Sequence, residues 1–344
     1  MGLLAPLLSL VVAAILSASL IPIIRPLLLR HALATPNGRS SHTNPTPQGA
    51  GIAVIGATLA VGGCAAALST AVDTRTIAIV FGATIFIAIV GALDDLKPIP
   101  VLPRLIAHAI AVGVILAALP TESRILASSP LWLERILLLI AGIWFVNLVN
   151  FMDGLDWMTV AETVPITGAL VLLGAIGSLP PTAALTAAAL CGAMLGFAPF
   201  NRPVAKIFLG DVGSLPVGLL LGWALLELAL YGHLIAALLL PLYYLADTTV
   251  TMLRRAFNGE QFWVAHRSHF YQRATDNGFT VLQVVGTVFV LNLFLVALAI
   301  LTTVLSSITA QLLLLVAGAL AVVATMYRFD RSRQAAVELR HRVD

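Results

Sequence analysis

The sequence predicts an all-α, polytopic integral membrane protein, and two observations carry that prediction. Of the 344 residues, 60% are hydrophobic and only 10% are charged, whereas soluble domains carry about 25% charged residues. The apolar residues are gathered into long runs, and a helix needs about 20 of them to cross the hydrocarbon core. Helices are the expected form because backbone groups in lipid must hydrogen-bond within their own segment.

Eleven apolar runs are predicted to be membrane helices. They cover residues 4–24, 49–69, 76–93, 102–119, 134–150, 158–179, 182–199, 214–231, 233–253, 279–304 and 308–327. The first run is interpreted as a retained membrane helix, because it lacks the positively charged leading segment of a signal peptide. The sequence offers no soluble domain or clear repeat, so residues 1–344 are predicted to form one transmembrane domain.

The distribution of Lys and Arg predicts the orientation of these helices. Sixteen of the nineteen lie on the side that the chain reaches after its first helix, and cytoplasmic loops carry such an excess. We therefore expect the N-terminus outside and the C-terminus in the cytoplasm, with a basic tail over 328–344 attracted to anionic lipid. Cys64 and Cys191 lie in different apolar runs and indicate neither a disulfide nor a thiolate metal site.

The polar side chains that could carry chemistry fall on the same side. They occupy the loops 30–48, 94–101, 150–157, 200–213 and 254–278. Connectors on the other side are short and plain, so a candidate site is expected on the cytoplasmic face alone.

Asp94 and Asp95 end the third predicted helix. Adjacent carboxylates at a membrane surface repel unless a cation or a proton relieves them, and Lys97 and Arg104 nearby would suit a phosphate. The alternative is a solvated helix end, which one Asp-Asp pair does not exclude.

The stretch NFMDGLDW places Asn150, Asp153 and Asp156 at steps of three residues. If the helix continues or turns there, the three share one face. Amide and carboxylate oxygens suit Mg²⁺ or Mn²⁺ better than zinc. The alternative is an Asx-type turn around Gly154.

The stretch FLGDVGS places Asp211 between two glycines at the start of the eighth predicted helix. The two glycines, Gly210 and Gly213, would let backbone amides approach a ligand. Ser214 could cap the helix, whose positive end then suits a phosphate. Phe208 could stack on a base, although packing is the more ordinary role of a lone aromatic.

Two further loops carry basic residues. HRSHFYQR contains His266, Arg267 and His269, which favour anion binding, or form a basic loop attracted to lipid. RSSHTNPTPQGAG contains Arg39 and Ser40 in an ordered polar loop or a plain connector. Asp247 lies near the end of the ninth predicted helix, and we leave it open between a supporting role and an interfacial one.

Taken together, acids grouped for a metal and bases grouped for phosphate predict metal-assisted phosphoryl transfer at the cytoplasmic surface. GALDDLKP, NLVNFMDGLDW, KIFLGDVGSLPVG and AHRSHFYQR, in this order, resemble the motifs of the polyprenyl-phosphate N-acetylhexosamine-1-phosphate transferases. That superfamily includes the phospho-MurNAc-pentapeptide transferases and the enzymes that initiate surface polysaccharides.

The resemblance implies a catalytic set. Asp94 matches the carboxylate proposed to deprotonate the lipid phosphate, and Asp95 stands beside it. Asp211 matches the main metal ligand, Asn150 a second ligand or a pyrophosphate contact, and Asp153 a further acid of the cluster.

The resemblance also implies substrate contacts. Asp156 and Phe208 match positions near the uridine, and His266, Arg267 and His269 match a motif that contacts phosphate and sugar. The rest of the predicted substrate-binding set follows from the chemistry of the residues themselves and not from the resemblance. It consists of Lys97, Gly210, Ser214, Arg39 and Ser40.

The implied reaction transfers N-acetylhexosamine-1-phosphate from a UDP-sugar to undecaprenyl phosphate with Mg²⁺, or Mn²⁺ as the alternative, at the bacterial inner membrane. Trp157 stands where the family often has glycine, and the histidine string lacks a triple histidine, which favours a surface-polysaccharide initiator over a pentapeptide transferase. A transporter and a lipid-binding scaffold are the less favoured classes. No nucleic-acid partner is expected, and a homodimer, the sugar and a one-step or two-step mechanism stay open.

Overall fold

The computed structural model describes residues 2–34, 45–70, 72–261 and 266–331, and these contain thirteen helices and one short β-hairpin. The predicted all-α membrane protein is thereby confirmed. The helices are α1 Leu4–His31, α2 Gly51–Ala67, α3 Thr74–Leu96, α4 Val101–Ala118, α5 Leu131–Met152, α6 Met158–Ala175, α7 Pro181–Phe197, α8 Asp211–Leu230, α9 Leu234–Leu239, α10 Leu242–Phe257, α11 Phe270–Asp276, α12 Val281–Val304 and α13 Ile308–Asp330. Strands β1 Leu33–Ala34 and β2 Thr46–Pro47 pair antiparallel.

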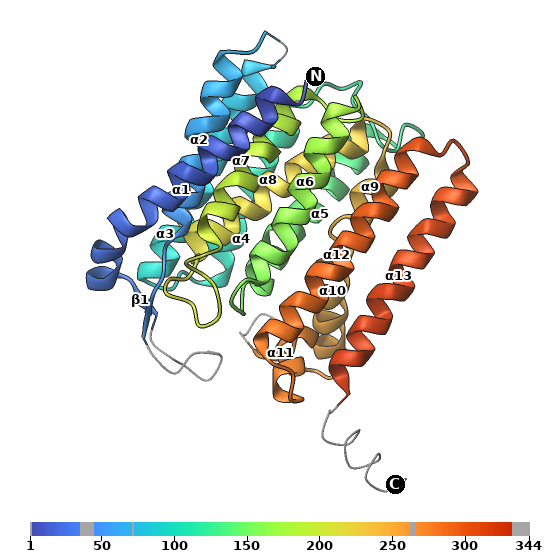
Figure 1. Cartoon of the computed structure of the whole chain (residues 1–344). Coiled ribbons are helices and arrows are strands. Elements are labelled where there is room, and N and C mark those ends of the chain that lie inside the picture. Colours follow the sequence, from blue (N-terminus) through green and yellow to red (C-terminus); the bar gives the residue numbers. More distant parts are fainter. Residues whose placement is uncertain (1, 35–44, 71, 262–265, 332–344) are drawn as a thin grey trace, which may run out of the picture.

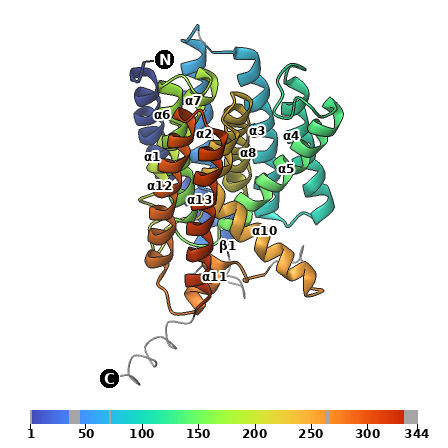
Figure 2. The same cartoon turned by 90° about the vertical axis from the view of Figure 1, so that its right-hand side faces the viewer.

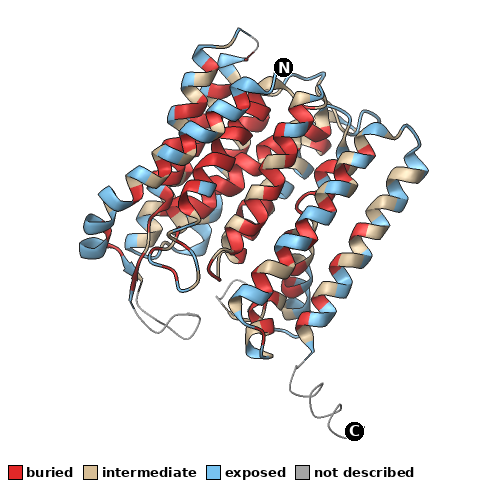
Figure 3. Ribbon diagram, viewed as in Figure 1, coloured by how far each residue is buried: buried red, intermediate tan, exposed pale blue. Residues whose placement is uncertain are grey.

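Most of the long helices run side by side as a bundle (Figure 1). Eight in the described residues are long and apolar enough to cross a membrane, namely α1, α3, α4, α5, α6, α8, α12 and α13. Helices α2 and α7 are shorter and equally apolar. In Figure 3 the buried residues concentrate in the inner helices, whereas α1 and α13 show alternating exposed positions. Their exposed leucines and valines form the surface that a bilayer would cover.

The predicted single helix over 233–253 is wrong, because the chain breaks there into α9 and α10. The break falls at Pro241, whose missing N–H and ring both oppose a continuous helix. In Figure 2, α10 leaves the common helix direction and runs out to the side of the bundle. The predicted loop 254–278 accordingly begins with the last turn of α10 and contains α11.

A short stretch after β2 runs along the segment that precedes α8. Phe208 N donates to Pro47 O at 2.9 Å, and Phe208 O accepts from Gly49 N and Ala50 N. Gly51 N then donates to Leu209 O. These backbone bonds join the start of α2 to the start of α8, which sets where α8 begins.

Glycines allow α2 and α3 to touch the first turn of α8. A Cβ on Gly51 would lie 2.2 Å from Gly213 Cα, and one on Gly91 would lie 2.3 Å from Asp211 O. Both distances are far inside van der Waals contact. The helix ends that carry Asp94–Asp95 and Asp211 are therefore brought together by backbone packing that no larger residue permits.

We predict that Gly91→Ala destabilises the protein by about 1–3 kcal/mol, the cost of overpacking a filled contact. Gly82→Ala is the matched control on the same helix, because a Cβ there meets nothing within 4 Å and alanine favours the helix. Apparent melting temperatures in detergent measure both variants. Equal melting of Gly91→Ala and wild type would contradict the close packing of α3 on α8.

Candidate active site

The Asp95 carboxylate caps the N-terminus of α8. Its Oδ1 accepts from Asp211 N at 2.9 Å and its Oδ2 from Val212 N at 3.0 Å. A helix N-terminus offers unpaired N–H groups and a partial positive charge, so a carboxylate is well placed there. Gln48 Nε2 donates to Asp95 O at 3.0 Å and ties the stretch after β2 to the same point.

Two expectations for the FLGDVGS stretch are therefore corrected. The N-cap of α8 is Gly210 rather than Ser214, which lies buried in the first turns of the helix. A Cβ on Gly210, whose φ is +75°, would lie 2.6 Å from Asp95 Oδ2. The glycines thus make room for Asp95 and for α2. The first two backbone amides of α8 already donate to the Asp95 carboxylate, contrary to the expectation that they would bind a phosphate.

Asp94, one residue earlier, points to a different set of groups. Its Oδ2 accepts from Arg104 Nη1 at 2.8 Å, and its Oδ1 accepts from Ile99 N at 2.5 Å. The Asp94 carboxyl also interacts directly with the Asp211 carboxyl. Arg104 therefore supplies the positive charge that lets two carboxyl groups lie together.

Asn150, in the last turn of α5, joins the cluster from a third helix. Its Nδ2 donates to Asp211 Oδ1 at 2.7 Å and lies 2.9 Å from Ser214 Oγ. Asp94, Asn150, Asp211 and Ser214, all predicted site residues, are brought together from the ends of α3, α5 and α8.

Asp153 and Asp156 point away from Asn150, because α5 ends at Met152 and the chain turns. Asp153 Oδ1 accepts from Thr159 Oγ1, and Asp156 Oδ2 accepts from Ala205 N at 3.0 Å. The helical face that would have presented all three side chains together does not form. The pKa of Asp153 is raised to about 7, mainly because the carboxyl is buried. The Thr159 hydrogen bond acts against this rise, and the Asp95 and Asp156 charges add to it.

The residues of the Asp94–Asp211 cluster fit Mg²⁺. Within the described residues, no three His, Cys, Asp or Glu side chains form a metal-binding group. Asp94 and Asp211 form a smaller set of carboxylates, and Mg²⁺ uses one or two carboxylates together with water and substrate phosphates. Asn150 presents its Nδ2 to this set. A cation here would also relieve the repulsion that Asp95 and Asp94 exert on the Asp211 carboxylate.

Trp157 has φ +64°, a left-handed conformation that glycine adopts more readily than tryptophan. Its N donates to Asn201 Oδ1 at 2.8 Å and its Nε1 to Ala198 O at 2.6 Å. The tryptophan is held in this turn by contacts with the segment before α8.

A second polar centre forms around Asp247, which is fully buried in α10. Its carboxylate accepts from Phe270 N and Tyr271 N at 3.1 Å each, and contacts His269 Nδ1 at 3.1 Å. Tyr243 and Thr251 donate hydroxyls to it as well. The sequence left the role of Asp247 open between a supporting and an interfacial one. The sequence shows only that an acid lies near the end of an apolar run.

The two polar centres meet through Tyr271. Its hydroxyl donates to Phe151 O at 3.0 Å, beside Asn150, and a Cβ on Gly154 would lie 2.2 Å from that hydroxyl. The His269 ring lies 6.4 Å from the Phe151 ring and stacks on His266 at 5.0 Å. The start of α11 is therefore seated directly against the end of α5.

The remaining predicted residues lie at the edges. Arg267 pairs with Asp276 at 3.3 Å and Thr275 at 3.1 Å, and Lys97 is exposed at the end of α3. Phe208 is half-buried beside Gln48. Arg39 and Ser40 lie outside the described residues.

Comparisons with known proteins found similar sequences. Residues 77–229, which include α3, α5 and the start of α8, match glycosyl transferase family 4. The chain is 27% identical over 309 residues to a probable undecaprenyl-phosphate N-acetylglucosaminyl 1-phosphate transferase of Bacillus subtilis, covering 81% of this chain and 82% of that protein. It is 35% identical over 126 residues to a phospho-N-acetylmuramoyl-pentapeptide-transferase of Limosilactobacillus fermentum, covering 37% and 38%. A pentapeptide transferase of Nostoc punctiforme is 34% identical over 163 residues, covering 44% and 42%.

We predict that Asp247→Ala lowers the stability by several kcal/mol, because each buried donor left unpaired costs about 1–3 kcal/mol. Asp276→Ala is the control, since its carboxylate is 55% exposed and such surface pairs contribute about 0–1 kcal/mol. Thermal melting in detergent gives both values. Similar melting of the two variants would mean that Asp247 does not hold the α10–α11 connection.

Proposed function

We propose, from the match of residues 77–229 to glycosyl transferase family 4, that the protein transfers N-acetylhexosamine-1-phosphate from a UDP-sugar to undecaprenyl phosphate. The products are the sugar-diphospho-undecaprenol and UMP. The observation that carries the proposal is the cluster of Asp94, Asn150 and Asp211 at three helix ends on one side of the bundle. The Bacillus subtilis relative, whose name gives this chemistry with N-acetylglucosamine, supports it over most of the chain.

We infer eleven membrane crossings, counting the eight long helices, α2, α7 and the broken pair α9–α10 as one. Sixteen of the nineteen lysines and arginines belong to the sequence segments expected on the same side as Asp94 and Asp211, so we infer that this side faces the cytoplasm. A bacterial inner membrane with a cytoplasmic site is consistent with the donor, because UDP-sugars are soluble anions that do not cross lipid.

In the proposed reaction an oxygen of the lipid phosphate attacks the β-phosphorus of the UDP-sugar. The bond between the β-phosphorus and the bridging oxygen breaks, and UMP leaves with that oxygen. Asp94 takes the proton of the lipid phosphate, and Arg104, which pairs with Asp94 at 2.8 Å, holds its carboxylate toward the cluster. Phosphoryl transfer depends mainly on positioning and charge neutralisation, which such a site can supply.

The carboxylates of Asp211 and Asp94 would hold Mg²⁺. Asn150, predicted as a second ligand, presents its Nδ2 to Asp211, and Asp153, the further acid predicted from the sequence, accepts from Thr159. When bound, the cation would neutralise the diphosphate and stabilise the departing UMP. Asp95 keeps Asp211 in place through the α8 cap, so its role in this proposal is to position the ligand.

A panel of donors tests the proposed activity. Purified protein with undecaprenyl phosphate and Mg²⁺ is expected to release UMP from UDP-N-acetylglucosamine or a related UDP-N-acetylhexosamine, including 6-deoxy forms. The partial matches to pentapeptide transferases make UDP-MurNAc-pentapeptide the competing donor. Turnover of that donor alone would replace the proposed substrate, and turnover of none would remove the activity.

We predict that Asp211→Asn lowers metal-dependent UMP release by about 10²-fold or more, the usual cost of losing a group that stabilises transition-state charge. The amide keeps the size of the side chain, so folding is expected to survive. Glu260→Gln, a neutralised acid on the exposed turn after α10, is the control for general charge loss. Full turnover by Asp211→Asn would exclude it as the metal ligand.

We predict that Asp94→Asn lowers turnover by about 10²–10⁴-fold, the range for a lost general base, and leaves donor affinity within a few-fold. Steady-state UMP release and calorimetric titration with UDP-N-acetylglucosamine separate the two quantities. A variant that loses donor affinity and keeps normal turnover would make Asp94 a binding residue.

A further inference from the structure

A second cavity lies at the end of the bundle away from the Asp94–Asp211 cluster. It measures about 520 Å³ and is formed by the ends of α3, α4 and α8 with the loops around them. Three carboxylates line it, those of Asp73, Glu122 and Glu227. A cavity of this size is within the range of small-molecule sites.

The charge of this cavity is negative. Arg124 is the one cation among the described residues that line it, and it is already engaged: Nε pairs with Glu134 at 2.5 Å, and Nη2 donates to Ser129 O. Glu227 Oε1 accepts from Trp223 Nε1 at 3.1 Å, which fixes its carboxylate on the α8 side of the cavity. The cavity therefore selects a group with positive charge.

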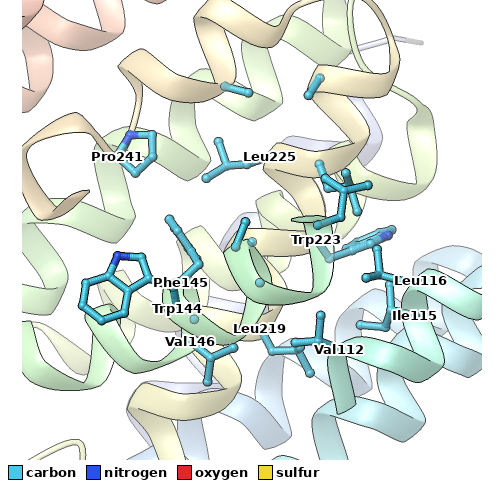
Figure 4. A pocket seen from close by; sticks show the side chains of 18 of the residues that line it. Val112, Ile115, Leu116, Trp144, Phe145, Val146, Leu219, Trp223, Leu225 and Pro241 are labelled. Carbon is cyan, nitrogen blue, oxygen red and sulfur yellow. The ribbon is translucent and has the colours of Figure 1, made fainter. Parts of the chain in front are cut away.

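This cavity adjoins an apolar one. Ile115 and Trp223 line both, and the second cavity, of about 290 Å³, continues between α4, α5, α8 and α9 toward Pro241. Figure 4 shows Trp223 and Ile115 at one end of it and Trp144 and Pro241 at the other. Its rim includes Leu238, which is 39% exposed on the lipid-facing surface.

We propose that the two contiguous cavities bind one phospholipid with an amine headgroup, drawn from the leaflet opposite the active site. The ammonium group pairs with Glu227 and the neighbouring carboxylates, and one acyl chain fills the apolar cavity. A small soluble cation would leave the apolar part empty, and an anionic lipid would face three carboxylates. This site is independent of the proposed transferase activity.

Native mass spectrometry of the delipidated full chain tests the proposal. The protein is mixed with equal amounts of phosphatidylethanolamine and phosphatidylglycerol that carry the same acyl chains. We expect phosphatidylethanolamine adducts to exceed phosphatidylglycerol adducts by about fivefold, the ratio of one partly exposed ion pair. Glu227→Gln is expected to remove most of that preference, and Ala141→Phe, which narrows the apolar cavity, to lower binding of both lipids.

Matched variants separate this site from general effects. Glu260→Gln removes an acid at the other end of the bundle and is expected to keep the full preference. If Glu227→Gln melts below wild type, Glu122→Gln replaces it, because Glu122 is exposed on the same cavity. Equal binding of the two lipids by wild type, or an unchanged preference in both variants, would overturn the proposal.

Discussion

Two backbone amides at the start of α8 donate to the Asp95 carboxylate, and the geometry of the whole cluster depends on this contact. It fixes the first turn of α8 against the end of α3, so Asp211 is held beside Asp94. Hydrogen bonds to a charged group contribute about 1.5–3 kcal/mol each, and the helix dipole adds to them. Gly91 and Gly51 let the backbones come close enough for the contact to form.

The adjacent acids Asp94 and Asp95 consequently have different roles. Asp95 satisfies a helix end, whereas Asp94 faces Arg104 and Asp211. The Asp247 centre repeats the first arrangement, because another buried carboxylate accepts two backbone amides at the start of α11. In both places a carboxylate joins segments far apart in the sequence. A predicted site residue lies beside each contact, Asp211 at the start of α8 and His269 just before α11.

The sequence predicted the fold well, because apolar length decides membrane helices. It failed at α9–α10, where Pro241 interrupts a run whose hydropathy is continuous. Asp94, Asn150 and Asp211 were predicted together and lie together. The capping role of Asp95 and the orientations of Asp153 and Asp156 could not be predicted, because they depend on where α5 ends and on how closely α3 packs against α8. Asp247 was equally hidden, since the two backbone amides that it accepts from follow more than twenty residues later.

The Mn²⁺ affinity of the purified protein with Asp95 replaced by alanine tests the central role of the α8 cap most directly. Electron paramagnetic resonance of free Mn²⁺ gives that affinity beside wild type, with melting in detergent to show that the variant is folded. If Asp95 places Asp211 and Asp94, a folded variant binds Mn²⁺ about tenfold more weakly or worse, within the range for lost ligand-orienting partners. A folded variant with wild-type Mn²⁺ affinity would contradict the account.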